Sequence, residues 1–495
     1  MRADLAPIAL TALFGFAGLG VLAALDFVKP SLSEVLGALG LAYLVGVGAV
    51  LLPAIGLLTL GVAVRLPGLV ALCAAIGLAG IGVAARRRGC LRGLIHRPSW
   101  SRRGLGLDVL VAAVFLVTFG MYAVLGFQHA SVLPLDAWDA WAIWTNKAVA
   151  LVEWGGLRPE FFASPAYSYM HLDYPVLMPL YEAIYFRAAG TVNTQAVHVH
   201  FWTLLIAFVW AAGFIASRVT RPALWAPILV AFALAPGVSS QLLTLYADVP
   251  VAIFLCIGIL LLGLWLSDRR PAELALATLF LATAANIKNE GLVAGLAALV
   301  VLALVVVVSP PPQLTRVRAL GPALAALAGF IVGVLPWRIW MESHHITGDL
   351  PVRDALDPSF LWDRSDRVWP SIEALAGQLV LQERWFYVVP LALAVVAVCL
   401  AIGVLRQVAA FYLLTGVMVF AGLIWAYWIS PNDLGWHLST SVDRVATSVV
   451  FVGLAALLHL SGALERVAPA RDRAKSGAAP MGDSEAASRV ESHPV

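Results

Sequence analysis

Two aspartates three residues apart begin the part of this chain that is best equipped for chemistry. Asp136 and Asp139 lie in the segment Leu-Asp-Ala-Trp-Asp, with Trp138 between them. If the segment turns helically, residues i and i+3 share a face, and the two carboxylates point the same way. Such a pair can act as a general base or hold a divalent cation. A solvated loop with an interfacial tryptophan is the alternative.

A second motif, His-Leu-Asp-Tyr-Pro, follows at residues 171–175. Proline disfavours the helical conformation in the residue before it, so Tyr174 is expected to be extended. That backbone would present His171 and Asp173 on one side, where they can orient the imidazole or bind a metal ion; a turn ahead of an interfacial helix is the alternative. Lys147 lies between the two motifs and is one of four lysines, against 28 arginines. This scarcity favours a position that needs a compact ammonium.

Three further charged positions occur where apolar segments meet. Asp248 stands in Tyr-Ala-Asp-Val-Pro, and Lys288 and Glu290 stand in Asn-Ile-Lys-Asn-Glu-Gly. The ammonium of Lys288 could bind a phosphate as a point charge, with Glu290 pairing with it or orienting it. The alternatives are a simple boundary residue for Asp248 and a salt bridge that closes a hairpin for the other two.

The last motif covers residues 433–444 and contains His437 and Arg444. Both side chains can donate hydrogen bonds to the oxygens of a phosphate or diphosphate. A boundary arginine that faces lipid headgroups is the alternative.

The elements that must position these residues are membrane-spanning helices. The chain has 495 residues, of which 61% are hydrophobic and 12% are charged, whereas about a quarter of an average soluble domain is charged. Apolar runs of about 20 residues recur, which is long enough to cross a bilayer core. The sequence therefore predicts an all-α polytopic membrane protein with about 13 transmembrane helices (range roughly 11–14) and large outer loops.

The predicted spans cover most of the chain and leave the charged motifs between them. The segment 175–190 is too short and too mixed to cross, and is expected at the interface or as a re-entrant piece. The spans are expected at 5–26, 36–63, 68–85, 107–128, 197–217, 223–243, 249–266, 273–287, 291–308, 319–340, 386–405, 409–428 and 444–463.

Sidedness follows from the distribution of arginine. Residues 86–103 hold seven arginines and no acid, which predicts a cytoplasmic loop and places 129–196 outside. Residues 273–308 are either one long span or a hairpin. A single span would bury Lys288 and Glu290 at about 2.5–3.5 kcal/mol each. The hairpin avoids that cost and puts every charged motif on the outer side, with 341–385 as a second outer segment and a cytoplasmic C-terminus.

Several function classes lack support in the sequence. It has no Walker A loop, no Rossmann glycine motif and no zinc-protease or serine-hydrolase motif in a usable context. The four cysteines have no metal or disulfide spacing. No nucleic-acid partner is expected, and the first apolar run is expected to be a retained span rather than a cleaved signal.

Taken together, the order and common sidedness of these motifs resemble the type-C (GT-C) membrane glycosyltransferases. They are similar to the bacterial branch related to protein O-mannosyltransferases and lipid A aminoarabinose transferases. The resemblance covers residues 107–463, which it implies are a catalytic membrane core. Residues 1–106 would form a three-span region with the basic loop, and 464–495 a disordered cytoplasmic tail.

The resemblance implies transfer of a sugar from a polyprenyl-phosphate donor to a lipid, glycan or protein acceptor, at the outer face of the cytoplasmic membrane. Asp136, or with slightly lower preference Asp139, would be the general base, and Lys288 with Arg444 or His437 would neutralise the leaving phosphate. No cofactor is certain from the resemblance, and a divalent metal ion is possible, with Asp136, Asp139 and His171 as its candidate ligands. The expected substrate-binding residues are Trp138, Lys147, His171, Asp173, Tyr174, Asp248, Lys288, Glu290, His437 and Arg444.

Three other functions fit parts of the same pattern. A flippase or transporter for lipid-linked sugars would need a polar path through the bilayer, whereas the charges cluster on one side. A polysaccharide polymerase or ligase would use similar donors. A non-catalytic membrane scaffold would leave Lys288 and Glu290 unexplained.

Overall fold

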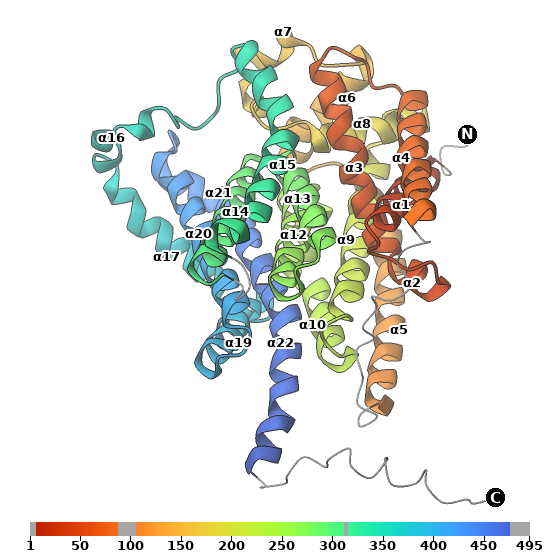
Figure 1. The fold of residues 1–495 in the computed structure, drawn as a ribbon. Helices are drawn as coiled ribbons and strands as arrows, with labels where there is room; N and C mark the ends of the chain where they lie inside the picture. The colour runs from red at the N-terminus through yellow and green to blue at the C-terminus, as the bar shows by residue number, and fades with distance from the viewer. Residues whose placement is uncertain (1–5, 88–104, 311–314, 476–495) are drawn as a thin grey trace, which may run out of the picture.

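The chain forms a bundle of helices in the computed structural model, which describes residues 6–87, 105–310 and 315–475 (Figure 1). Within these ranges every regular element is helical and no strand occurs. The expected all-α class is confirmed. Most of the arginine-rich loop at 86–103 and the end of the tail beyond 475 lie outside the described residues.

Every predicted span is helical in the structure. In the described ranges, nine helices are long and apolar enough to cross a membrane, or ten if α10 and α11, bent by 48°, form one broken span. Three of the predicted spans are shorter apolar helices within α1, α13 and α19. The helices at the predicted spans are α1 (Ala6–Ala24), α3 (Leu39–Thr59), α4 (Leu66–Arg87), α5 (Leu105–Ala130), α9 (Thr194–Ala216), α10 (Pro222–Leu234), α11 (Pro236–Leu243), α12 (Asp248–Asp268), α13 (Pro271–Ala285), α14 (Asn289–Val308), α15 (Arg316–Ser343), α19 (Val388–Ile402), α20 (Arg406–Ile429) and α22 (Thr447–Lys475).

Helix α12 lies at the centre of the bundle. It packs against α13 and α22 and also contacts α9, α14 and α20. Its apolar window is completely buried, whereas only 11% of the window of α5 is buried. A helix that is apolar all round is stable only inside protein or lipid. The outward-facing leucines and valines of α5 therefore fit a lipid-facing position, and α12 fits the protein interior.

Residues 273–308 form two helices joined by a sharp turn, as the hairpin prediction requires. Helix α13 ends at Ala285 and α14 begins at Asn289, and the two helices pack against each other. Gly291 permits this close crossing, because a Cβ atom there would lie 2.1 Å from the carbonyl oxygen of Ala284. Lys288 has an extended backbone in the turn.

The N-terminal helices pack directly against the helices of the core. Helix α1 packs between α3 and α4, and α3 continues the packing onto α9, α13 and α15. Small residues let the backbones approach, since a Cβ at Gly18 would lie 1.7 Å from the carbonyl oxygen of Ala42. At the buried contact with the core, the hydroxyls of Tyr43 and Tyr181 are 2.6 Å apart.

The ends of the bundle carry different structures. At one end, the upper one in Figure 1, short helices form a cap: the π-helix η1 (Ala140–Thr145), α6 (Asn146–Trp154), α7 (Pro159–Phe162), the 3-10 helix η2 (Pro165–Met170) and α8 (Leu177–Ala189). At the other end, Arg221 bridges Asp108 at 2.9 Å and Glu465 at 2.6 Å. Helix α22 continues to Lys475, beyond the predicted start of the tail at 464.

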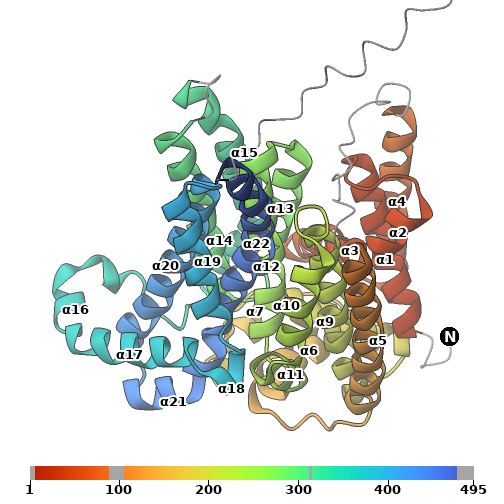
Figure 2. The ribbon, with the colours of Figure 1, turned by 90° about the horizontal axis from the view of Figure 1, so that it is seen from below.

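The chain between α15 and α19 forms an arm. It consists of η3 (Asp354–Leu356), α16 (Pro358–Trp362), η4 (Ser365–Arg367), α17 (Val368–Leu379) and α18 (Gln382–Trp385), and it is also visible from below (Figure 2). The arm projects at α16 and returns to the bundle, where α17 packs against α20 and α18 packs against α11. Arg364 ties it to the end of α20 by donating to the carbonyl of Ser430 at 2.8 Å. Helix α21 (Leu434–Val445) packs against α17.

Candidate functional site

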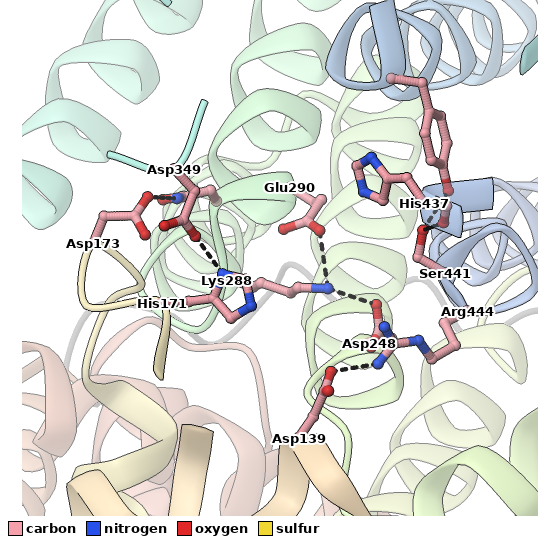
Figure 3. A network of polar contacts seen from close by, with 12 residues as sticks. Asp139, His171, Asp173, Asp248, Lys288, Glu290, Asp349, His437, Ser441 and Arg444 are labelled. Atoms are coloured by element: carbon pink, nitrogen blue, oxygen red, sulfur yellow. Dashed lines mark hydrogen bonds and ion pairs between the residues drawn. The ribbon is translucent and has the colours of Figure 1, made fainter. Parts of the chain in front are cut away.

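A cavity of about 840 Å³ collects most of the predicted site residues. It lies between the cap, α14, α15, α20, α21 and the loop that follows α15. Segments hundreds of residues apart in sequence thus meet at one place, as Figure 3 shows for the polar side chains. The predicted residues that line it are Trp138, Asp139, His171, Asp173, Tyr174, Lys288, Glu290, His437 and Arg444.

Two groups of charged residues occupy this region. The first, called here the Lys288 cluster, contains Asp139, Asp248, Lys288, Glu290 and Arg444. The second, called the Asp173 cluster, contains Lys147, His171, Asp173, Asn289, Arg338 and Asp349.

In the Lys288 cluster, the lysine is held by two carboxylates. Its Nζ lies 2.9 Å from Asp248 Oδ1 and 2.9 Å from Glu290 Oε1. Burial lowers the pKa of Lys288, but the attraction of both carboxylates outweighs burial and holds that pKa above its ordinary value. The ammonium is therefore charged and has a third hydrogen-bond donor beyond these two contacts.

Arg444 carries the second positive charge of this cluster. Its Nη1 lies 2.5 Å from Asp139 Oδ2, and its guanidinium stacks over the ring of Tyr246 at 4.5 Å. Its buried Nε has no hydrogen-bond partner in the described structure. Asp139 immediately precedes the π-helix η1, an element that recurs at functional sites. The arginine thus keeps a donor available for a ligand.

The Asp173 cluster is organised around a buried carboxyl group. Asp173 is 5% exposed, and its Oδ2 accepts a hydrogen bond of 2.8 Å from Asn289, which in turn accepts one of 2.6 Å from Arg338. Its other oxygen, Oδ1, has no partner within the described residues. His171 forms an ion pair with Asp349, and this pair is more exposed than Asp173.

Burial and neighbouring charge shift two groups of this cluster. Burial and the carboxylate of Asp349 raise the pKa of Asp173 to about 7, against the attraction of Lys147. Burial lowers the pKa of Lys147 to about 7, although Asp173 and Asp349 favour its charged form. The Nζ of Lys147 donates to the carbonyl of His171 at 2.6 Å. Lys147 therefore stabilises the loop by holding its backbone at His171.

Three predicted residues lie away from the cavity lining. Lys147 and Asp248 are buried behind it, where they hold the His171 backbone and Lys288. Asp136 is exposed and outside the cavity. Residues 133–137 are not helical, and the first helical turn begins at Trp138, so the expected shared face of Asp136 and Asp139 does not form.

The three candidate metal ligands do not come together. Asp136 lies outside the cavity, Asp139 pairs with Arg444, and His171 pairs with Asp349. In the part of the chain that the structure describes, no group of three or more histidine, cysteine or acidic residues could hold a metal ion.

Sequence reasoning missed several residues of the site. Arg338 is an arginine within a predicted span, and an intramembrane charge is a recognised signal of function. Asn289 lies between Lys288 and Glu290, and the sequence alone indicated no function for it. Asp349 belongs to the outer segment 341–385 and follows no motif, so only the fold places it beside His171.

Comparison with known proteins adds no identification. No protein-family model, curated protein or solved structure matches this chain. Functional inference therefore depends on the geometry of the cavity.

Proposed function

We propose that this protein is a membrane glycosyltransferase that transfers a sugar from a polyprenyl-phosphate donor to an acceptor hydroxyl. The observation that carries the proposal is the meeting of Asp139, Arg444 and Lys288 at one cavity. Such a site can bind a phosphate and an uncharged polyhydroxyl group side by side, which is the chemistry of a sugar phosphate.

The phosphate of the donor would lie between Lys288 and Arg444. Both cations have unused donors, and both are held in place by carboxylates rather than by the ligand. Charge-assisted hydrogen bonds from such groups to phosphate are the stronger class. Because these donors are fixed in advance, they stabilise the charge that develops on the leaving phosphate as its bond to the sugar breaks.

The lipid part of the donor has an apolar wall available next to Lys288. Leu292 and Val293 of α14 line the cavity together with Val419 and Leu423 of α20. These two helices pack against each other and carry apolar side chains outward. A polyprenyl chain would bury apolar surface against this wall at about 25 cal/mol per Å².

The sugar would lie beside the exposed tryptophans of the cavity lining. Trp138 is 55% exposed and Trp436 is 58% exposed, and both line the cavity. Indole rings that are this exposed in a cavity offer their faces to a ligand, and they also carry a polar N–H at the ring edge. By the resemblance to the GT-C enzymes, displacement at the anomeric carbon proceeds directly, with inversion.

We further propose that the cavity faces the outer side of the cytoplasmic membrane and that the C-terminus is cytoplasmic. This orientation rests on the arginine bias of the sequence. Cysteines placed at Ala137 and Ser476 should then react with impermeant reagents from opposite sides. Labelling of both from one side would contradict the orientation.

The proposal is tested with the purified full-length protein in lipid nanodiscs and a panel of polyprenyl-phosphate sugars. We expect at least one donor to be consumed with release of polyprenyl phosphate. The exposed Glu160 gives a matched control, since Glu160→Gln should retain activity while Lys288→Gln should lose it. A folded protein that consumes no donor of the panel, or that uses a nucleotide sugar instead, would overturn the proposed function.

A further inference from the structure

One oxygen in the cavity is buried, polar and unsatisfied. Asp173 Oδ1 has no hydrogen-bond partner in the described structure, although the residue lines the cavity and is only 5% exposed. A buried polar atom without a partner is costly, and native structures tolerate few of them. A ligand that donates a hydrogen bond to this oxygen would remove the cost.

The rest of the Asp173 carboxyl group is rigidly held. Its Oδ2 accepts the hydrogen bond from Asn289, and the Trp337 indole donates to the Asp173 backbone carbonyl at 3.2 Å. The ammonium of Lys147 also holds the neighbouring His171 carbonyl by a hydrogen bond. The free oxygen therefore has a defined direction, which a group that accepts a proton from a bound substrate needs.

Asp139, the other acid of the lining, is placed differently. Its Oδ2 is committed to the guanidinium of Arg444 at 2.5 Å. This oxygen is therefore occupied by the guanidinium and is not free to accept the proton of a substrate hydroxyl. Asp139 is therefore better suited to orienting Arg444 than to taking a proton.

We propose that Asp173, and not Asp139, is the general base of the transfer; this inference rests on the proposed function. The acceptor oxygen forms a bond to the anomeric carbon while the bond from that carbon to the lipid-phosphate oxygen breaks. The electron pair leaves with the phosphate, beside Lys288 and Arg444. The proton of the acceptor hydroxyl passes to Asp173 Oδ1.

The proton then has a route out of the site. The carboxylate of Asp349 lies near enough to Asp173 to raise its pKa by charge repulsion, and Asp349 pairs with His171. The side chains of His171 and Asp349 are 40% and 37% exposed. A proton taken up at the buried aspartate can move along this pair to water, which resets the base for the next turnover.

The surrounding charges set the protonation of the base. Asp349 and burial raise the pKa of Asp173, Lys147 and His171 oppose them, and Arg338 is held next to it through Asn289. A base works best when its pKa lies near the working pH. The repulsion of a neighbouring carboxylate moves the pKa of a buried carboxyl group toward such a value.

The test uses the full-length protein and a donor that the wild type consumes. Asp173→Asn should lower kcat by about 10²–10⁴-fold while the KM of the donor stays within about threefold. Asp139→Asn should chiefly raise the KM of the donor. Asp349→Asn should move the acid limb of the kcat profile to lower pH, because it removes the repulsion that raises the pKa of Asp173.

Infrared titration gives a readout that does not depend on turnover. A protonated-carboxyl component should disappear near neutral pH in the wild type, and the difference between the wild-type and Asp173→Asn spectra should contain it. If Asp173→Asn turns over normally while Asp139→Asn loses kcat, Asp173 is not the base although the protein is still a transferase. If the wild type consumes no donor, the proposed function fails and this inference fails with it. A band that titrates only at the ordinary pH of an aspartate would also overturn the inference.

Discussion

The Lys288 cluster and the Asp173 cluster lie in the same region but differ in which charged groups are paired. In the first, Lys288 contacts two carboxyl groups and Arg444 contacts one, at 2.5–2.9 Å, so each cation is paired with an acidic side chain. In the second, two carboxyl groups face each other and one oxygen has no partner within the described residues. Paired opposite charges suit the binding of an anion, whereas paired like charges suit the exchange of a proton.

The two clusters are joined by three consecutive residues. Lys288 and Glu290 belong to the first cluster, and Asn289 donates to Asp173 in the second. The extended backbone of Lys288 and the start of α14 send these neighbouring side chains in different directions. A change in this turn is therefore expected to disturb both clusters, whereas a change farther away should disturb only one.

The largest effect on stability is expected when the Lys288 cluster loses Lys288, one of its two cations. Lys288→Met leaves the carboxylate of Asp248, which is 6% exposed, without its partner. Breaking a buried ion pair from one side costs about 3–5 kcal/mol of unfolding free energy. Denaturant unfolding in mixed micelles measures this loss. In a double variant that also carries Asp248→Leu, much of the stability should return; an equal loss in both would show that the ion pair does not account for the effect.

A smaller effect is expected from Arg444→Lys, which keeps the charge but removes the guanidinium. The unpartnered Nε is lost, and with it one charge-assisted hydrogen bond to the donor phosphate. Such a bond contributes about 1.5–3 kcal/mol, which corresponds to roughly a 10–100-fold weaker donor affinity. Titration with a non-hydrolysable polyprenyl phosphonate measures it. An unchanged affinity would mean that the phosphate binds elsewhere.

The shifted pKa values of the Asp173 cluster should make the free energy of unfolding depend on pH. The pKa of Asp173 is raised on folding, so the unfolded chain binds fewer protons between about pH 4 and 7, and stability falls as the pH rises through this range. The pKa of Lys147 is lowered, so the unfolded chain binds more protons between about pH 7 and 10, and stability rises there.

Together these two shifts predict a stability minimum near neutral pH for this pair. Melting temperatures measured in steps across both ranges provide the test, with Asp173→Asn as the comparison. The variant should show a smaller fall in melting temperature between about pH 4 and 7 than the wild type, and it should keep the rise above this range. A profile identical to that of the wild type would contradict the raised pKa of Asp173.

The smallest effect separates the two aspartates of the first motif. Asp136 is exposed and outside the cavity, so Asp136→Asn should change stability by no more than about 0.5 kcal/mol. Donor turnover should also be unchanged, whereas Asp139→Asn should weaken donor binding because it releases Arg444. Equal losses in the two variants would contradict the separation.

The sequence predicted the architecture well because apolar length is a direct requirement of the bilayer. Each span must be long and apolar, so its position is visible in the chain without knowledge of its neighbours. The turn at Lys288 was also predictable, because burying two charges in one continuous span is costly. The roles of the charged residues remained predictions.

The local geometry of the first motif was less predictable. The i, i+3 spacing of Asp136 and Asp139 suggested one face, but residues 133–137 are not helical and the helix begins only at Trp138. Helix boundaries are hard to place from sequence, and here a shift of two residues decides which aspartate enters the cavity.

By itself, the sequence determined that this is an all-α polytopic chain and that its ionisable residues gather in particular loops, because hydrophobic length and charge cost act locally. Only the tertiary structure decided which charges meet: Arg444 with Asp139, His171 with Asp349, and Asn289 with Asp173. These partners are between 116 and 305 residues apart. Their contact depends on how the helices pack around α12, and no spacing within the chain encodes that packing directly.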